Sequence, residues 1–533
     1  MNKNFFLRFY NFYFFASCTF TFIYLAANLF SSYWDGLFIY LLSLKPSIGQ
    51  EIYKDYSFQH APYLNFFFQL LNYFFQDSYN LLLVLGIIQS LFAGYLSYLF
   101  CSKIIKSSFI KKVCFVITIF SFSIEYNFFY HDAYVFLIGV YSLYLIFIKK
   151  NTFIGNLFLA LVFFLKQTFG FTFVFIYFFI IIFESFYKKK FIFLKSIIYF
   201  FVFIIIYLLL ILIFADIKKF YYENVLFTFF YAEHSAKNSL LNYIFGIFFL
   251  FPNISSVDEL KIIFSRVNFS YSQVIFYIIF RLPTFLINFY LLYKIRDFTK
   301  DYYKVFLIII LSTILPQPLL GRLYWGTIYF FPIVPIIFIV YISEKNNYSI
   351  INSEEVLKKI IYIYSFIVFL YLALCMLQRV NYIEFSKKFI IKSKKHFFLN
   401  IHKKQIDNND FDYVRDMYEF MRNLEIKKGV YLLDASSMSI LFLLNQPILN
   451  RDFTTELSES SYHWKERKLK YPGDNKNFLE RFIIDIQEKN PEFVLYKIDE
   501  FYFIKKILPY NIFKDYNVKY ANNKFVLLEK VNN

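Results

Sequence analysis

Apolar residues follow one another along most of this chain in long runs, separated by short polar or basic stretches. A helix of roughly 17 to 25 apolar residues is long enough to cross a bilayer. Runs of this length lie at 9–30, 79–100, 113–130, 191–214, 272–293 and 360–378. Shorter runs lie at 133–148, 152–166, 168–186, 305–320 and 325–342. The pattern predicts an α-helical polytopic membrane protein.

The loops between these runs predict an orientation, because cytoplasmic loops of membrane proteins are rich in lysine and arginine. Basic residues gather in four loops: Lys103, Lys106, Lys111 and Lys112; Lys149 and Lys150; Lys188 to Lys190; and Lys294, Arg296, Lys300 and Lys304. All four loops are cytoplasmic only if 61–75 and 241–251 do not cross. The result is about eleven crossings, an inner N-terminus and an outer tail. Segment 61–75 would then be a helix lying in the membrane interface.

The tail after the last run has the composition of a soluble domain. It alternates an amphipathic helix at 411–424, a strand in 429–435, a helix at 478–489, a strand in NPEFVLYKI, a short helix near 500–516 and a hairpin turning at Asn522 and Asn523. We therefore predict a transmembrane domain over 1–378, with an outer loop at 31–78, and a small extracytoplasmic α/β domain over 379–533. Basic residues just after the last run, from Arg379 to Lys395, favour the opposite side for the tail.

Composition supports membrane insertion, with 59% hydrophobic residues among 533 and a mean hydropathy of +0.48. The net charge of +18 would suggest nucleic acid in a soluble protein. Here the lysines lie between apolar runs, so we read them as membrane anchors and expect no nucleic-acid partner. The four cysteines have no metal-ligand spacing.

A polar interruption at 31–62 separates the first two apolar segments and contains Trp34, Asp35, Glu51, Asp55 and His60. Acids beside a membrane are costly to desolvate and mark a candidate site. A carboxylate such as Asp35 can accept the proton of an acceptor hydroxyl as a general base. The alternative is that Asp35 caps the following helix, and that Asp55 closes a turn before the helix at 61–75.

The next outer loop contributes a further acid, Asp132, with His131 and Glu125 nearby. These groups can position a hydroxyl, or Asp35 and Asp132 can hold a divalent cation through oxygen ligands. Helix capping is the alternative for Asp132. No clustered acid motif is present, so we expect no metal and no other cofactor, with a divalent cation as the open alternative.

Two cations lie at predicted outer turns, Lys166 in FFLKQTFGF and Arg322 in PQPLLGRLYWG. An ammonium or a guanidinium in such a place can bind phosphate. For Lys166 the alternative is that the side chain extends to water along the helix. Arg281 and Pro283, inside an apolar run, suggest a broken helix beside a cavity.

Several of these segments together resemble the GT-C superfamily of polytopic glycosyltransferases, which includes protein O-mannosyltransferases and the lipid A aminoarabinose transferase. The resemblance rests on WDG at 34–36, IYKDYSFQHAPYLNFFFQLL at 52–71, HDA at 131–133, LKQTFG at 165–170 and GRLYWGTIYFFP at 321–332. It implies a polyprenyl-phosphate sugar as donor, transfer at the extracytoplasmic face of a plasma membrane of bacterial type, and inversion at the anomeric carbon.

The resemblance also implies roles for single residues. Asp35 would be the base, and Asp55 and Asp132 would be the acids that accompany it. Lys166 and Arg322 would contact the donor phosphate and stabilise the leaving group. Supporting positions would be His60, His131 and Tyr324. The sequence departs from the family's pattern at Ala61, where many members have a second proline, and at Trp325 and Gly326, where a histidine is common.

The sequence therefore predicts a membrane glycosyltransferase whose partners are a polyprenyl-phosphate sugar, membrane lipid and a lipid, glycan or protein acceptor. Two other functions stay open. One is a transporter or flippase for polyprenyl-linked glycans, which would need polar residues at mid-membrane depth. The other is a glycan polymerase or ligase that uses a diphosphate-linked donor.

Overall fold

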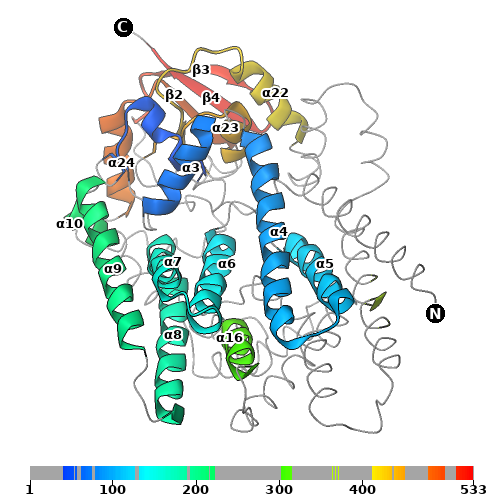
Figure 1. Cartoon of the computed structure of the whole chain (residues 1–533). Helices are drawn as coiled ribbons and strands as arrows, with labels where there is room; N and C mark the ends of the chain where they lie inside the picture. The colour runs from blue at the N-terminus through cyan, green and yellow to red at the C-terminus, as the bar shows by residue number, and fades with distance from the viewer. Residues whose placement is uncertain are drawn as a thin grey trace, which may run out of the picture.

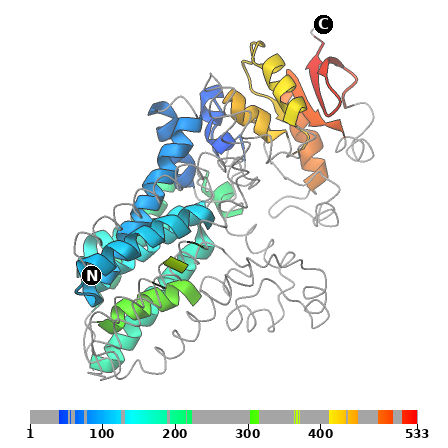
Figure 2. The ribbon, with the colours of Figure 1, turned by 90° about the vertical axis from the view of Figure 1, so that its right-hand side faces the viewer.

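The computed structural model describes residues 40–52, 55–56, 62–74, 78–125, 131–188, 193–214, 216–222, 302–314, 363, 366–367, 370, 411–434, 437–450, 478–498 and 512–531. These residues form a bundle of helices with a small four-stranded sheet and its own helices at one end (Figures 1 and 2). We call this end of the bundle the sheet end.

The bundle is built from α4 (Ser78–Ile104), α5 (Ser108–Glu125), α6 (His131–Leu143), α7 (Thr152–Leu165), α8 (Gln167–Lys188), α9 (Leu194–Phe214) and α16 (Tyr302–Ile314). Helix α4 packs on α5, and α7 packs on α6, α8 and α9. Helix α6 continues into a π-helical turn, η2 (Tyr144–Ile148), and the ring of Tyr144 meets Phe100 of α4 edge-on with centroids 5.2 Å apart. Helix α9 leads back to the sheet end, where α10 (Ile217–Phe220) follows.

The prediction of about eleven membrane crossings with a GT-C-like fold is wrong for the part of the chain that the structure describes. Only two helices there are long and apolar enough to cross a membrane, Leu85–Ile104 and Leu194–Ile213. Three shorter apolar helices cover Tyr134–Ile148, Thr152–Leu165 and Gly170–Phe186. The predicted runs at 9–30, 272–293 and 325–342 lie outside the described residues.

The physical reason is that an apolar run alone does not distinguish a membrane span from a helix buried in protein. In the first candidate span 56% of the residues are buried inside the protein, against 22% in the second. Helix α4 thus uses its apolar surface largely for packing on its neighbours. Helix α9 leaves most of its apolar surface uncovered, among it Val202, Ile205, Leu209 and Ile213.

The C-terminal sheet has the strand order β1-β2-β4-β3. Its strands are β1 (Tyr431–Leu432), β2 (Phe493–Lys497), β3 (Tyr516–Ala521) and β4 (Phe525–Lys530). Strand β1 runs parallel to β2, whereas β4 is antiparallel to β2 and β3. The turn between β3 and β4 is closed by Asn522, whose side-chain oxygen accepts from the amides of Lys524 at 3.0 Å and Phe525 at 2.8 Å. The predicted strands and the hairpin are confirmed.

In the described part of the C-terminal region, three helices pack beside the sheet: α22 (Phe411–Met421), α23 (Met438–Leu444) and α24 (Phe478–Lys489). The predicted helices at 411–424 and 478–489 are confirmed, and Val414, Met417 and Met421 are buried on one face of α22. Helix α23 was not predicted, because a seven-residue apolar run fits a strand equally well. Of the helix expected near 500–516, residues 499–511 lie outside the described part and 512–515 form a turn.

The segment between the first two apolar runs joins these two parts of the molecule. It contains a short 3₁₀ helix, η1 (Lys45–Ile48), and the helix α3 (Pro62–Phe74). The predicted helix at 61–75 is thus confirmed. Buried residues of this segment belong to the same hydrophobic core as residues of the bundle and of the C-terminal elements. Helix α3 lies between the sheet and the bundle (Figure 1).

Candidate functional site

Residues 40–56 fold directly against the C-terminal elements. The hydroxyl of Tyr40 donates a hydrogen bond of 2.7 Å to the side-chain oxygen of Asn445, and its ring meets Phe442 edge-on at 5.3 Å. From α24, the Nζ of Lys489 donates to the backbone oxygen of Asp55 at 3.2 Å. We call this contact between residues 40–56 and the C-terminal elements the loop–sheet junction. It places the predicted acidic loop and the C-terminal sheet at the same end of the bundle.

Lys45 is the most deeply buried cation of this junction, with no exposed surface. Its Nζ donates to the backbone oxygens of Leu449, at 3.5 Å, and of Asn450. Asn450 in turn accepts from the amide of Leu432 at 2.8 Å and donates to its carbonyl at 2.7 Å. Because an ammonium removed from water needs partners, this chain of hydrogen bonds fixes residue 45 to strand β1.

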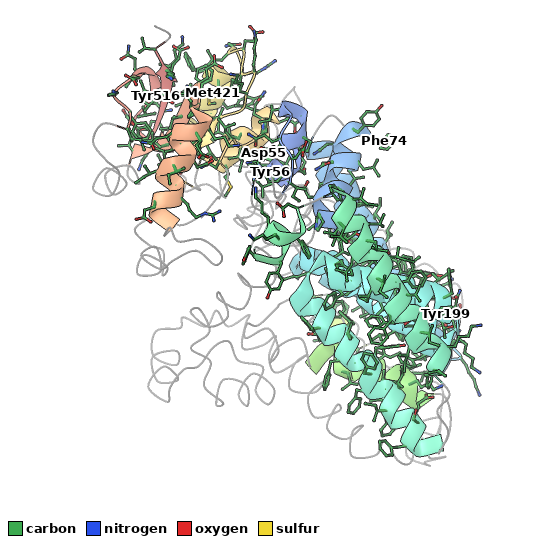
Figure 3. All side chains as sticks on the ribbon, turned by 90° about the vertical axis from the view of Figure 1, so that its left-hand side faces the viewer. Asp55, Tyr56, Phe74, Tyr199, Met421 and Tyr516 are labelled. Atoms are coloured by element: carbon green, nitrogen blue, oxygen red, sulfur yellow. The ribbon has the colours of Figure 1, made fainter. Side chains whose placement is uncertain are left out.

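Asp55 closes a turn, as the structural alternative predicted. Its amide donates to the carbonyl of Glu51 at 2.9 Å, and its Oδ2 accepts from the amide of Glu51 at 2.8 Å. Asp55 therefore has a structural role in this turn. Figure 3 shows Asp55 and Tyr56 between the C-terminal elements and the bundle.

Tyr56 connects the junction to α3. Its buried hydroxyl donates to the side-chain oxygen of Asn65 at 3.3 Å, and the Nζ of Lys45 lies 4.7 Å from the centroid of its ring. Burial raises the pKa of Tyr56 well above its usual range, although the hydrogen bond to Asn65 offsets part of the shift. The hydroxyl therefore remains protonated and acts as a hydrogen-bond donor at neutral pH.

Helix α3 has one face on the protein and one face uncovered. Its second residue, Tyr63, donates from its hydroxyl to the carbonyl of Tyr207 in α9 at 2.7 Å. Its uncovered side carries only large apolar or aromatic side chains, namely Phe67, Leu70, Tyr73 and Phe74. The ring of Phe74 points away from the molecule in Figure 3. This amphipathic character agrees with a helix at a membrane interface, a location that stays a prediction.

Lys166 forms the break between α7 and α8. Its backbone is extended, with φ −155° and ψ 112°, and its carbonyl accepts from the amide of Gly170 at 2.8 Å. Gly170 is required because a Cβ there would collide with the backbone of Phe163. Lys166 is only 7% exposed, so its side chain is enclosed and does not extend along the helix into water. Phe164 lies two residues before Lys166 and packs on Tyr63 of α3, with the two ring centroids 6.1 Å apart.

His131 and Asp132 are the first two residues of α6. This position fits the capping alternative for Asp132 and the proposed acidic role equally well. Two residues further on, the ring of Tyr134 meets Phe67 at 5.8 Å and Phe68 at 6.4 Å. The beginning of α6 therefore lies beside α3.

Residues close in sequence to three candidates contact helix α3. They are Tyr56, next to Asp55; Phe164, two residues before Lys166; and Tyr134, two residues after Asp132. Asp55 and Lys166, the first and last of these three candidates, lie 111 positions apart in the sequence. Four other candidates, Asp35, His60, Arg322 and Tyr324, lie outside the described residues, as does Arg281.

Sequence reasoning missed three polar residues of this region, namely Lys45, Asn65 and Lys489. Lys45 is the only charged residue between Asp35 and Glu51 and precedes a proline, which is a visible signal of a special position. Asn65 and Lys489 have no such signal, because a polar residue in an amphipathic helix is ordinary.

Within the described ranges no group of three histidine, cysteine or acidic side chains is arranged to hold a metal ion. No family model, curated protein or solved structure matches the chain.

Proposed function

We propose that the protein is a membrane glycosyltransferase that moves a sugar from a polyprenyl-phosphate donor to a lipid, glycan or protein acceptor on the outer face of the membrane. The observation that carries the proposal is that α3 contacts Tyr56, Tyr134 and Phe164, each of which lies within two residues of a candidate, namely Asp55, Asp132 and Lys166. Two acids and an enclosed cation beside an uncharged amphipathic helix suit a reaction between a hydroxyl and a lipid-linked phosphate ester. The resemblance of the sequence segments supports the same class.

In this proposal a carboxylate removes the proton of the acceptor hydroxyl, and the oxygen attacks the anomeric carbon of the donor sugar. The bond between that carbon and the phosphate oxygen breaks, with inversion, and the lipid phosphate leaves as an anion. Asp35 is the proposed base, with Asp55 and Asp132 as accompanying acids. Lys166 and Arg322 are the proposed phosphate ligands, because a cation near the leaving group stabilises its developing charge.

The loop–sheet junction supports a common side of the membrane for the acidic loop and the C-terminal elements, since the two are in contact. Two observations support the membrane itself. One is the apolar surface that α9 leaves uncovered, and the other is the uncharged, aromatic outer face of α3. We therefore propose an outer location for both the site and the C-terminal elements.

The test is transfer of radiolabelled sugar by the purified protein, reconstituted in liposomes with a polyprenyl-phosphate sugar and an envelope extract. Asp35→Asn should lower transfer by about 10²- to 10⁴-fold, the usual contribution of a general base. The matched control is Asp216→Asn, because Asp216 caps α10 by accepting from the amides of Lys218 and Lys219. The control should retain transfer, and chelation of divalent cations should leave the rate unchanged.

Three outcomes would contradict parts of the proposal. Unchanged transfer by Asp35→Asn removes that residue as the base. Transfer with a diphosphate-linked donor but not with a monophosphate donor favours a polymerase or ligase. Movement of the labelled lipid between leaflets without any transfer favours a flippase.

A further inference from the structure

Lysine residues gather at the end of the bundle opposite the sheet end. Three connections between helices lie there: the turn between α4 and α5, the turn between η2 and α7, and the segment between α8 and α9 (Figure 1). The described lysines of these connections and of the adjacent helix ends are exposed or half-exposed, and they are Lys103, Lys106, Lys111, Lys112, Lys149, Lys150 and Lys195. We call this end of the bundle the lysine end.

Contacts between aromatic rings join the three connections. The ring of Tyr144, in η2, packs on Phe100, one turn before the end of α4, with the ring centroids 5.2 Å apart. Phe147, also in η2, meets Phe193, which directly precedes α9, at 5.6 Å. A lysine follows each of Phe100, Phe147 and Phe193 by two or three residues. The packing of these rings therefore brings lysines from three parts of the sequence to one end of the molecule.

Acidic residues do not balance these charges. The sequence contains no acid over 78–124, and Glu184 is the only acid over 133–215. The carboxylate of Glu184 is buried in an ion pair of 2.8 Å with Lys304 of α16, so it does not face the exposed lysines. Among the described residues the lysine end is therefore a surface of one sign, and a positive surface attracts an anionic partner.

Exposed aromatic side chains begin directly beside the lysines. Phe153 of α7 follows Lys149 and Lys150 closely in the sequence, is 53% exposed, and packs on Tyr199 of α9 with the ring centroids 5.5 Å apart. The Nζ of Lys195 lies 5.5 Å from the centroid of the same Tyr199 ring. We call these five residues the lysine–aromatic patch. Figure 3 shows Tyr199 far from Met421 and Tyr516 of the C-terminal elements.

Cations beside an apolar surface fit the chemistry of an anionic phospholipid. The phosphate of such a lipid attracts ammonium groups, and its acyl chains pack on apolar side chains. Leu194 and Ile198 continue the exposed apolar surface along the first turns of α9. A soluble anion would contact the lysines but would leave the apolar part of the surface in water.

We propose that the lysine–aromatic patch binds the headgroup of an anionic phospholipid at the membrane surface opposite the sheet end. The proposal rests on the membrane location in the proposed function, and it is independent of the sugar-transfer reaction. Each lysine beside an anionic membrane surface contributes about fivefold in affinity. The three lysines of the patch together should therefore give a strong preference for anionic over zwitterionic lipid.

The experiment measures binding of fluorescent phosphatidylglycerol to the full-length protein in a non-ionic detergent, with phosphatidylcholine of the same acyl chains as the comparison. The test variant combines Lys149→Gln, Lys150→Gln and Lys195→Gln. The matched control changes the same amount of charge at three exposed lysines of the C-terminal elements, with Lys427→Gln, Lys428→Gln and Lys514→Gln combined.

The wild type should bind phosphatidylglycerol more tightly than phosphatidylcholine. The test variant should bind phosphatidylglycerol about ten- to hundredfold more weakly than the wild type at low ionic strength, whereas the control should bind it equally well. Equal affinity of the wild type for the two lipids would overturn the proposal. Equal weakening in the test variant and the control would attribute binding to the net charge of the protein and would also overturn it.

Glycerol 3-phosphate distinguishes a lipid from a soluble phosphate. It carries a phosphate without acyl chains, so it should not displace phosphatidylglycerol from the wild type at millimolar concentration. Displacement would assign the patch to a soluble anion and overturn the lipid assignment. If the triple variant does not fold, Lys195→Gln alone should weaken phosphatidylglycerol binding about fivefold, and unchanged affinity in this variant would overturn the proposal.

The lipid result is separate from the transfer result. Selective binding of phosphatidylglycerol through the patch, in a protein that transfers no sugar, supports the patch and contradicts the proposed reaction. Sugar transfer by a protein that binds the two lipids equally supports the reaction and overturns the patch.

Discussion

The ammonium nitrogen of Lys45 lies 4.7 Å from the centroid of the Tyr56 ring, and both side chains are buried. Lys45 is hydrogen-bonded to the segment that follows α23, and Tyr56 is hydrogen-bonded to helix α3. This pair therefore connects the C-terminal elements to the helix around which the candidate site is arranged. We therefore expect a change in the C-terminal elements to affect α3, and a change in α3 to affect the C-terminal elements, through the contacts of Lys45 and Tyr56.

Lys45→Met should weaken this connection with little change in side-chain length. The substitution leaves the carbonyls of Leu449 and Asn450 without their donor and removes the cation from the Tyr56 ring, so we expect a loss of about 2–4 kcal/mol. Thermal unfolding in detergent and limited proteolysis of the C-terminal elements measure the effect. The control is Lys195→Met, because Lys195 also lies over a tyrosine ring, that of Tyr199 at 5.5 Å, but is exposed. Equal stability of the two variants would contradict the assigned role of Lys45.

The hydrogen bond between Tyr40 and Asn445 can be measured by a double-mutant cycle. Asn445 has a left-handed backbone with φ 53°, which glycine adopts without strain. We therefore expect Asn445→Gly to cost less than Asn445→Ala, although both remove the acceptor. Combining Asn445→Gly with Tyr40→Phe should give a coupling energy of about 0.5–1.5 kcal/mol from chemical unfolding. Simple additivity would show that the bond does not contribute in solution.

Glu184 of α8 and Lys304 of α16 form an ion pair of 2.8 Å in which both side chains are almost fully buried. Glu184→Gln should destabilise the bundle by about 3–5 kcal/mol, because it leaves a buried ammonium without its counter-charge. The double variant Glu184→Leu with Lys304→Met should recover most of this loss.

The exposed pair of Glu425 and Lys427, at 3.3 Å, provides the control for that experiment. Glu425→Gln should change stability by less than about 0.5 kcal/mol, because water screens exposed charges. If Glu184→Gln were as mild as Glu425→Gln, the buried pair would not hold α8 and α16 together in solution.

Tyr516 provides a test of stability at alkaline pH. Burial, followed by the nearby charge of Asp515, raises the pKa of its hydroxyl to about 12, and the hydroxyl donates to the carbonyl of Pro491 at 2.6 Å. The unfolded chain loses this proton near pH 10, so the contribution of Tyr516 to stability is complete below pH 10 and is lost as the pH rises toward 12.

Tyr516→Phe should therefore show a smaller fall in unfolding free energy between pH 10 and pH 12 than the wild type, measured by denaturant unfolding at each pH. Tyr221→Phe is the control, since Tyr221 is about half exposed at the end of α10. Parallel pH profiles for Tyr516→Phe and the wild type would contradict the assignment.

Local patterns were sufficient for most C-terminal elements. The period of Val414, Met417 and Met421 gave the buried face of α22, and Asn522 with Asn523 gave the hairpin. These features depend on neighbouring residues, so the sequence contains the necessary information. The same reasoning failed for α23, where a short apolar run has no helical period long enough to detect.

The number of membrane crossings could not be decided in this way. The apolar runs at 133–148 and 152–166 fold as helices that pack on their neighbours, with α6, α7 and α8 in mutual contact. Transfer of an apolar side chain out of water is favourable whether the side chain enters lipid or a protein core. Length and composition therefore do not separate the two environments.

The helical character of the chain and the C-terminal strands follow from the sequence alone. The packing of the structure was needed to show that Tyr56, Tyr134 and Phe164 all contact α3, and that Lys45 is buried against the segment that pairs with strand β1. The reason is physical: a periodic pattern depends on neighbours along the chain, whereas the meeting of distant side chains depends on how whole helices pack.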